Sequence, residues 1–237
     1  MLSTAESIDG LLRELIGVDS WALTMHKLRE SLGSPDPQKL SGEVEMDGCY
    51  VNKHVRPINR VEDRKDLRLF QNQNPNKRAV IVMRQRGLPG EGAVKTLTFL
   101  SKSESQRTTR SLARDNIEKG TTVFADEHRA YDVLHADFHT LRVNHKAIYC
   151  GEAGENTNQA ESFFARFRRM QYGQHHNISN PYMTRYANEA AYREDTRRVS
   201  NGGIFLDITK RCAAKGVSRD FCGYWQGNKK TGEDLVL

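Results

Sequence analysis

Residues 44–51 of the chain read VEMDGCYV and place an acidic side chain in the middle of an apolar run. Val44, Met46 and Tyr50 lie at alternate positions, the period of a β-strand, so a strand is predicted here with Asp47 in its middle. A carboxylate on a central strand is costly to bury unless a partner compensates its charge. Asp47 is therefore the first candidate for a functional residue.

Strands and helices alternate along the sequence that follows. Short apolar runs predict four further strands, at residues 79–83, 94–100, 121–125 and 141–143. Helices are predicted at residues 103–119, at 130–135, from about 159 onward and at 181–198. Gly120 is expected to end the first of these helices, and Asn156 or Thr157 to cap the third. This order predicts an α/β domain with a mixed sheet flanked by helices.

Other segments surround or interrupt this domain. Residues 1–33 carry apolar side chains three and four apart in two blocks, which predicts a small helical segment. Its two helices form either a packing hairpin, the commoner arrangement, or part of a helix-turn-helix. Residues 52–78 are predicted to be a long basic loop. The chain is divided into a linker at 34–41, the α/β domain at 42–200 and a C-terminal tail at 201–237.

Composition favours a polyanionic partner. The chain has 36 Lys and Arg against 30 Asp and Glu, a formal charge of +6, and a pI near 9.2. Charge alone does not choose among DNA, RNA and an acidic membrane. No run approaches the roughly 20 apolar residues of a membrane span, and Met1 is not followed by a signal peptide, so a cytoplasmic protein is expected. The scattered cysteines are expected to be free thiols: Cys49, Cys150, Cys212 and Cys222.

Three carboxylates stand out by their positions in these elements. Asp47 lies inside the first strand, Asp126 follows the strand at 121–125, and Glu161 lies in the first turns of the helix from about 159. Gathered together, they would raise one another's pKa values unless a cation intervened. Carboxylate oxygens without Cys or His suit Mg²⁺ or Mn²⁺, and a pair of such ions suits phosphodiester chemistry. The alternative, which stays open, is that such acids only cap helices and balance dipoles.

The segments around these acids resemble the three acidic blocks of the ISXO-like insertion-sequence transposases. The blocks are residues 44–51, residues 123–131 (VFADEHRAY) and residues 156–169 (NTNQAESFFARFRR). From position 126 to position 161 the interval is 35, close to the spacing of the second and third acids in that superfamily. Further matches lie at residues 143–145 and 172–179, so the resemblance covers roughly residues 40–198 in collinear order.

The resemblance implies an RNase H-like DDE domain with transposase activity. Asp47, Asp126 and Glu161 would be its catalytic triad and would bind two Mg²⁺ or Mn²⁺ ions. The implied reaction is metal-dependent cleavage and transfer of DNA strands during transposition of an insertion sequence. The expected partners are the DNA ends of the element, the target DNA and further copies of the chain in a homo-oligomeric complex. When bound to DNA, the protein is expected at the nucleoid.

The resemblance also points to basic residues that would contact DNA. Arg168 is seven residues after Glu161, two turns along the same helix face, where these enzymes usually direct a Lys at DNA. Further arginines at helical spacing are candidates for phosphate contacts: Arg166, Arg169, Arg110 and Arg114. Surface arginines are common, so a solvated helix face remains the alternative.

Departures from the family pattern leave two other functions open. Gly48 stands where the family often has Glu, His128 where a Trp is usual, and Phe164 in place of the Trp of the third block. Family members typically carry a Cys-rich zinc ribbon in front, and this sequence has neither Cys-x-x-Cys pair, so we expect the chain to lack it. The main alternative is a catalytically silent or domesticated DNA-binding protein with the transposase fold. A housekeeping RNase H-like nuclease is less favoured.

Overall fold

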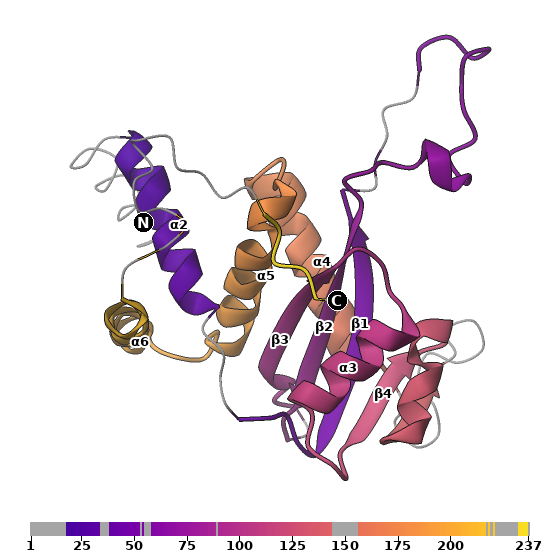
Figure 1. Ribbon diagram of the computed structural model, residues 1–237. Coiled ribbons are helices and arrows are strands. Elements are labelled where there is room, and N and C mark those ends of the chain that lie inside the picture. Colours follow the sequence, from indigo (N-terminus) through magenta and orange to yellow (C-terminus); the bar gives the residue numbers. More distant parts are fainter. Residues whose placement is uncertain are drawn as a thin grey trace. The chain divides into compact units, whose positions relative to one another are not determined.

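The chain folds into two compact units in the computed structural model (Figure 1). The structure describes residues 18–33, 38–52, 54, 58–88, 90–143, 156–216, 218, 220 and 232–236. One unit comprises residues 36–195 with 233–237, and the other comprises residues 1–35 with 196–232. In the described part of the chain, every helix is too short or too polar to cross a membrane.

The larger unit is built on a five-stranded mixed sheet with β1 in its centre. The strand order is β3-β2-β1-β4-β5. The strands are β1 (Glu43–Val51), β2 (Arg78–Arg86), β3 (Ala93–Ser101), β4 (Thr122–Asp126) and β5 (His139–Val143). β2 is antiparallel to both β1 and β3, whereas β4 is parallel to both β1 and β5. The predicted RNase H-like α/β fold with a mixed sheet is confirmed.

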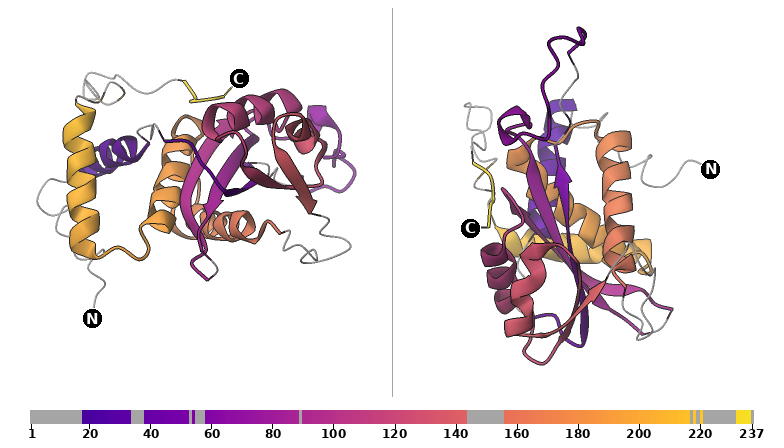
Figure 2. Two further views of the ribbon diagram at one scale, coloured as in Figure 1. Left: turned by 90° about the horizontal axis from the view of Figure 1, so that it is seen from below. Right: turned by 90° about the vertical axis from the view of Figure 1, so that its right-hand side faces the viewer.

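Helices cover both faces of this sheet, and Figure 2 shows the sheet on edge with α3 and α4 on opposite sides. One face carries α3 (Gln106–Asn116) and the 3-10 helix η2 (Arg129–Ala136). The other face carries α4 (Asn158–Arg169), which continues into a π-helical turn at Met170–Gln174, and α5 (Asn180–Asp195). The layered arrangement predicted from the alternation of strands and helices is therefore present.

The burial pattern of β1 determines which way its acidic residues point. Val44 and Met46 pack with α3 and η2, whereas Cys49 and Val51 pack with α4 and α5. Because alternate residues of a strand point to opposite faces, Asp47 points to the same face as Cys49, toward α4. The fold therefore places Asp47 on the side of the sheet that carries Glu161.

The first helix of the larger unit ends earlier than predicted. α3 stops at Asn116, and Ile117 leaves the helix with an extended backbone, φ −115°. Ile117 is buried and forms a parallel bridge with Leu40, so packing outweighs the helical pattern. Gly120 has a positive φ of 87° but lies beyond this end, so its expected role as the residue that ends the helix was wrong.

The predicted basic loop projects from the sheet between β1 and β2 (Figure 1). Its described residues include the short 3-10 helix η1 (Phe70–Asn72) and are mostly exposed. The projection also exposes apolar side chains, and Phe70 is 91% accessible.

The smaller unit contains two described helices. α2 (Val18–Leu32) agrees with the second of the two predicted N-terminal helices, and the first lies outside the described residues. α6 (Asn201–Lys215) occupies part of the segment expected to be a tail, and the Ser200 hydroxyl caps it by accepting the N–H of Gly203. Within this unit the Cys212 thiol donates to Ser31 Oγ at 3.3 Å. Cys49 and Cys212 are free thiols, while Cys150 and Cys222 are outside the described residues.

Truncating an aromatic residue of α4 is predicted to unfold the larger unit at lower denaturant. Phe167 is fully buried, and its ring stacks on that of Phe163 with centroids 6.0 Å apart. Phe167→Ala should lower the free energy of unfolding by about 3–5 kcal/mol. Urea denaturation followed by circular dichroism measures this. The exposed Arg169→Ala on the same helix is the control and should change stability by less than about 0.5 kcal/mol.

Candidate active site

Two of the predicted acids lie side by side on neighbouring parallel strands, Asp47 in the middle of β1 and Asp126 at the end of β4. β1 pairs with β4 so that Met46 lies opposite Ala125, which brings Asp47 and Asp126 next to each other one position further on. Each carboxylate accepts the backbone N–H of the following residue: Asp47 Oδ1 from Gly48 at 2.7 Å, and Asp126 Oδ1 from Glu127 at 2.6 Å. These bonds orient one oxygen of each carboxylate toward the backbone that follows it.

The third predicted acid acts on Asp47 from a helix. Glu161 lies in the first turn of α4, and its N–H donates to Thr157 O at 3.0 Å. The side chain is exposed. The negative charges of Asp126 and Glu161 both raise the pKa of Asp47, so the three carboxylates form one electrostatic group.

A fourth carboxylate, which sequence analysis missed, lies beside Asp47. Glu104 precedes α3, and its side chain runs past Gly48 so closely that a Cβ atom at residue 48 would overlap the carboxylate. The Tyr131 hydroxyl donates to Glu104 Oε1 at 3.2 Å, and the Glu104 N–H donates to the Tyr50 hydroxyl at 3.2 Å. The only signal in the sequence was Gly48 itself, because a missing side chain leaves room for another group.

Burial and neighbouring negative charges make Asp47 and Glu104 hard to ionise. Burial, followed by the charges of Glu104, Asp126 and Glu161, raises the pKa of Asp47 from 3.8 to about 7. Burial likewise raises the pKa of Glu104, although the nearby His128 and the hydrogen bond from Tyr131 act in the opposite direction. Burial together with the Glu104 charge holds the pKa of Tyr131 well above its usual range. Asp47 therefore keeps its proton to a higher pH than an ordinary aspartate does.

The donor set suits a hard divalent cation. Carboxylate oxygens are the ligands that Mg²⁺ and Mn²⁺ prefer, and a cation would relieve the repulsion that raises the pKa of Asp47. Among the described residues, no group of three or more His, Cys, Asp or Glu side chains already stands in ligand positions around one point. One oxygen of Asp47 and one oxygen of Asp126 each accept a hydrogen bond from a backbone N–H. The second oxygen of each carboxylate is left for a ligand.

One predicted DNA-contacting residue lies next to the acids. Arg168 Nη2 is 2.9 Å from the Sγ atom of Cys49. Cys49 follows Asp47 by two positions on the same face of β1, about 7 Å along the strand. The exposed Arg168 thus lies on the face of β1 that carries Asp47, and its contact with DNA stays a prediction.

The sequence of the chain matches one known protein family over most of its length. The sequence model of the ISXO2-like transposase domain matches residues 39–195. The chain belongs to this family. The match spans every element from β1 to α5 and includes Asp47, Asp126 and Glu161. A search of curated proteins found no match.

Within this ISXO2-like transposase domain, Glu104 takes the space of a missing side chain. The Glu104 carboxylate lies where a side chain of residue 48 would begin. Glu104 therefore brings negative charge next to Asp47 from a different part of the chain. Glu104 reaches it from the α3 face of the sheet, since Gly48 points away from α4.

The remaining predicted arginines lie in two places. Arg166 and Arg169 are exposed on α4, where Arg166 Nη1 donates to Glu194 Oε2 at 2.6 Å and to Ser162 Oγ at 2.8 Å. Arg169 Nε donates to Ala165 O at 3.3 Å. Arg166 is therefore held toward α5, whereas Arg169 contacts only its own helix among the contacts described.

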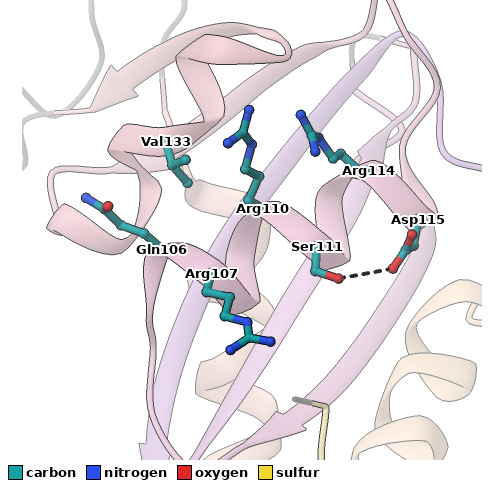
Figure 3. Close-up of a pocket in the computed structure, with 7 residues that line it drawn as sticks. All are labelled: Gln106, Arg107, Arg110, Ser111, Arg114, Asp115 and Val133. Carbon is teal, nitrogen blue, oxygen red and sulfur yellow. Dashed lines mark hydrogen bonds between the residues drawn. The ribbon is translucent and has the colours of Figure 1, made fainter.

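Arg110 and Arg114 lie on α3, on the opposite face of the sheet from α4. Arg110 Nε lies 2.6 Å from Asp137 Oδ2, and Arg114 Nη2 lies 2.6 Å from Asp137 Oδ1. The two arginines hold the pKa of the Asp137 carboxyl well below its usual range. They line an open pocket of about 580 Å³ together with Gln106, Arg107, Ser111, Asp115 and Val133. Figure 3 shows Arg107 pointing away from the other two arginines. The structure does not bring this basic face together with the triad.

The raised pKa of Asp47 predicts how stability depends on pH when no metal is bound. A carboxyl whose pKa rises on folding stabilises the folded state fully below its unfolded pKa, near 3.8, and loses this contribution as pH rises through about 7. The wild type should therefore lose stability relative to Asp47→Asn between pH 4 and pH 8. Urea denaturation of both proteins in EDTA across this range measures the difference. Parallel pH profiles would show that Asp47 titrates normally.

Proposed function

We propose that the chain is a DDE-type transposase that cuts DNA strands at the ends of an insertion sequence and joins the freed 3′-hydroxyl to target DNA. The observation that supports this most is the placement of Asp47 and Asp126 on adjacent parallel strands, with the charge of Glu161 acting on them from α4. Membership in the ISXO2-like transposase family supports the same reaction class. No covalent bond between protein and DNA is required by this chemistry.

The four carboxylates have different tasks in this proposal. Asp47 and Asp126 would hold two Mg²⁺ or Mn²⁺ ions between them, and Glu161 would complete one of the two sites. When bound, the ions supply activation of the attacking water or 3′-hydroxyl and stabilisation of the leaving oxygen. Glu104 is buried, with 7% of its side chain exposed, and keeps the region around Asp47 negative so that cations are attracted to it.

The surrounding arginines would position the DNA backbone. Arg168 lies beside the acids and is exposed, so a phosphate near the reacting strand can reach it. Arg169 would extend this contact along α4. Arg110 and Arg114 would form a separate phosphate-binding face on α3, where Asp137 neutralises part of their charge. Arg166 would contact phosphate only if it left Glu194.

Loss of one triad carboxylate is predicted to abolish the reaction. Asp126→Asn should lower strand transfer on element-end DNA with Mn²⁺ by more than about 100-fold, because even residues that only support metal ligands are worth 10–100-fold. Glu127→Gln is the matched control, since Glu127 is the adjacent acid and is exposed. It should retain activity.

The results of this experiment also separate the alternatives. Full activity of Asp126→Asn would contradict the triad assignment. A wild-type protein that binds DNA but neither binds Mn²⁺ nor cleaves would instead be the silent DNA-binding protein. Cleavage of hybrids or junctions without strand transfer would indicate an RNase H-like nuclease.

The DNA contact of Arg168 is predicted to change the salt dependence of binding. Each phosphate contact contributes about 0.9 to the slope of log K against log salt concentration. Arg168→Ala should therefore reduce the slope by about one unit, as measured by fluorescence anisotropy between 50 and 200 mM salt. Arg68→Ala, which removes an exposed arginine paired with Asp66 on the projection between β1 and β2, is the control and should leave the slope unchanged. Equal slopes for Arg168→Ala and the wild type would exclude the contact.

A further inference from the structure

A second acid on β1 is buried completely and serves a helix. Glu45 lies two positions before Asp47 on the same face of the strand, and none of its side chain is exposed. Its Oε2 atom accepts the N–H groups of Gln159 at 2.8 Å and of Ala160 at 3.0 Å. The first N–H groups of a helix have no partner within the helix. Glu45 therefore supplies the cap of α4 from a distant strand.

The capping residues predicted from the local sequence contribute less. Thr157 is the N-terminal flanking residue of α4, but its side chain makes no capping hydrogen bond. Asn156 Oδ1 accepts the N–H of Asn158 at a long 3.3 Å. The start of α4 is thus tied mainly to β1, the strand that carries Asp47.

Arg86 on β2 joins this cap to the other elements of the site. Its Nε donates to Glu45 Oε1 at 2.7 Å, and its Nη2 donates to Asn156 O at 2.6 Å. The guanidinium lies 3.8 Å from the centre of the Phe124 ring. Phe124 precedes Asp126 by two positions on β4. Arg86 therefore contacts β1, β4 and the residue that leads into α4.

We infer that Glu45 and Arg86 are positioning residues for the acidic triad. Together they contact all three elements that carry Asp47, Asp126 and Glu161, and Glu161 directly follows Ala160, whose N–H Glu45 holds. This inference rests on the proposed function, because it assigns a role to the placement of the triad. It extends that function to two residues that do not themselves touch metal or DNA.

The desolvation cost of the Glu45–Arg86 ion pair indicates that the pair serves to position α4 rather than to add stability. A buried ion pair usually adds little net stability, because desolvation offsets its attraction. Here both carboxylate oxygens of Glu45 accept hydrogen bonds, so neither is left without a donor. These bonds fix the orientation of the Glu45 side chain relative to Arg86 and to the start of α4. An apolar contact at the same place would not determine how far α4 lies along β1, whereas three directed hydrogen bonds to one carboxylate do.

Variants of Glu45 in the full chain separate its two contacts. Glu45→Ala removes both, whereas Glu45→Gln keeps one oxygen for the two N–H groups and loses the charged link to Arg86. In the metal-free protein, hydrogen exchange at the amides of Gln159 and Ala160 should be at least about 10-fold faster in Glu45→Ala and near wild type in Glu45→Gln. Leu112→Ala, in the core on the α3 face, is the control for lost stability and should not change exchange at these amides relative to the rest of α4.

Metal binding gives the second measurement. Calorimetric titration with Mn²⁺ should show an affinity at least about 10-fold weaker for Glu45→Ala than for the wild type, the usual effect of losing a supporting residue. Glu45→Gln should lie between them, and Leu112→Ala should bind as the wild type does. Arg86→Lys, which keeps the charge but not the fork to Asn156, should also weaken Mn²⁺ binding.

Two results would overturn the inference. Unchanged exchange at Gln159 and Ala160 in Glu45→Ala would show that Glu45 does not hold α4. Wild-type Mn²⁺ affinity in both Glu45→Gln and Arg86→Lys would show that the link does not position the acids, and this test stands if Glu45→Ala fails to fold. A wild-type protein without Mn²⁺ affinity would contradict the proposed function, whereas the exchange experiment would still test the attachment of α4.

Discussion

Crowding of carboxylates on and beside two adjacent parallel strands is the constraint around which this protein is organised. Burial, together with the charges of Glu104, Asp126 and Glu161, raises the pKa of Asp47 to about 7. A chain free to relax would separate these charges. The sheet prevents this for Asp47 and Asp126 because the register of β1 and β4 fixes their backbones side by side. The fold therefore keeps negative charge beside Asp47, where a bound cation would offset it.

The helix with the third acid needs a different kind of restraint, because packing alone allows a helix to slide. Phe163 and Phe167 of α4 fill the core on their face of the sheet. Apolar packing is not directional, whereas the hydrogen bonds of Glu45 and Arg86 are directional and act at the helix start. Arg84 adds to them by donating to Gln159 O at 2.6 Å. The charged side chains of Glu45, Arg84 and Arg86 thus meet the start of α4, next to Glu161.

Basic residues divide between the two faces of the sheet, so the net charge of +6 does not describe one continuous DNA-binding surface. Arg168 belongs to the face with the acids, and Arg110 and Arg114 belong to the opposite face and are partly neutralised by Asp137. DNA that contacted all of them would have to pass around the sheet edge. The spacing of arginines within one helix predicts that they share a face of that helix. Only the fold determines which of these faces lies beside the acidic residues.

Periodicity alone predicted the strands, the mixed sheet and the helices of the larger unit, because apolar alternation reflects which face of each element is buried. The strand and helix pattern placed Asp47, Asp126 and Glu161 on the elements that carry them, and the resemblance to the transposase family assigned their roles, which stay predictions. The role of Glu104 was not visible, since its contact with Asp47 depends on the space above Gly48. The end of α3 at Asn116 depends on a bridge between Ile117 and the distant Leu40. The cap of α4 likewise comes from Glu45, more than a hundred residues away. Local sequence determines which elements form, but only the folded chain brings distant residues within the few ångströms over which hydrogen bonds and buried charges act.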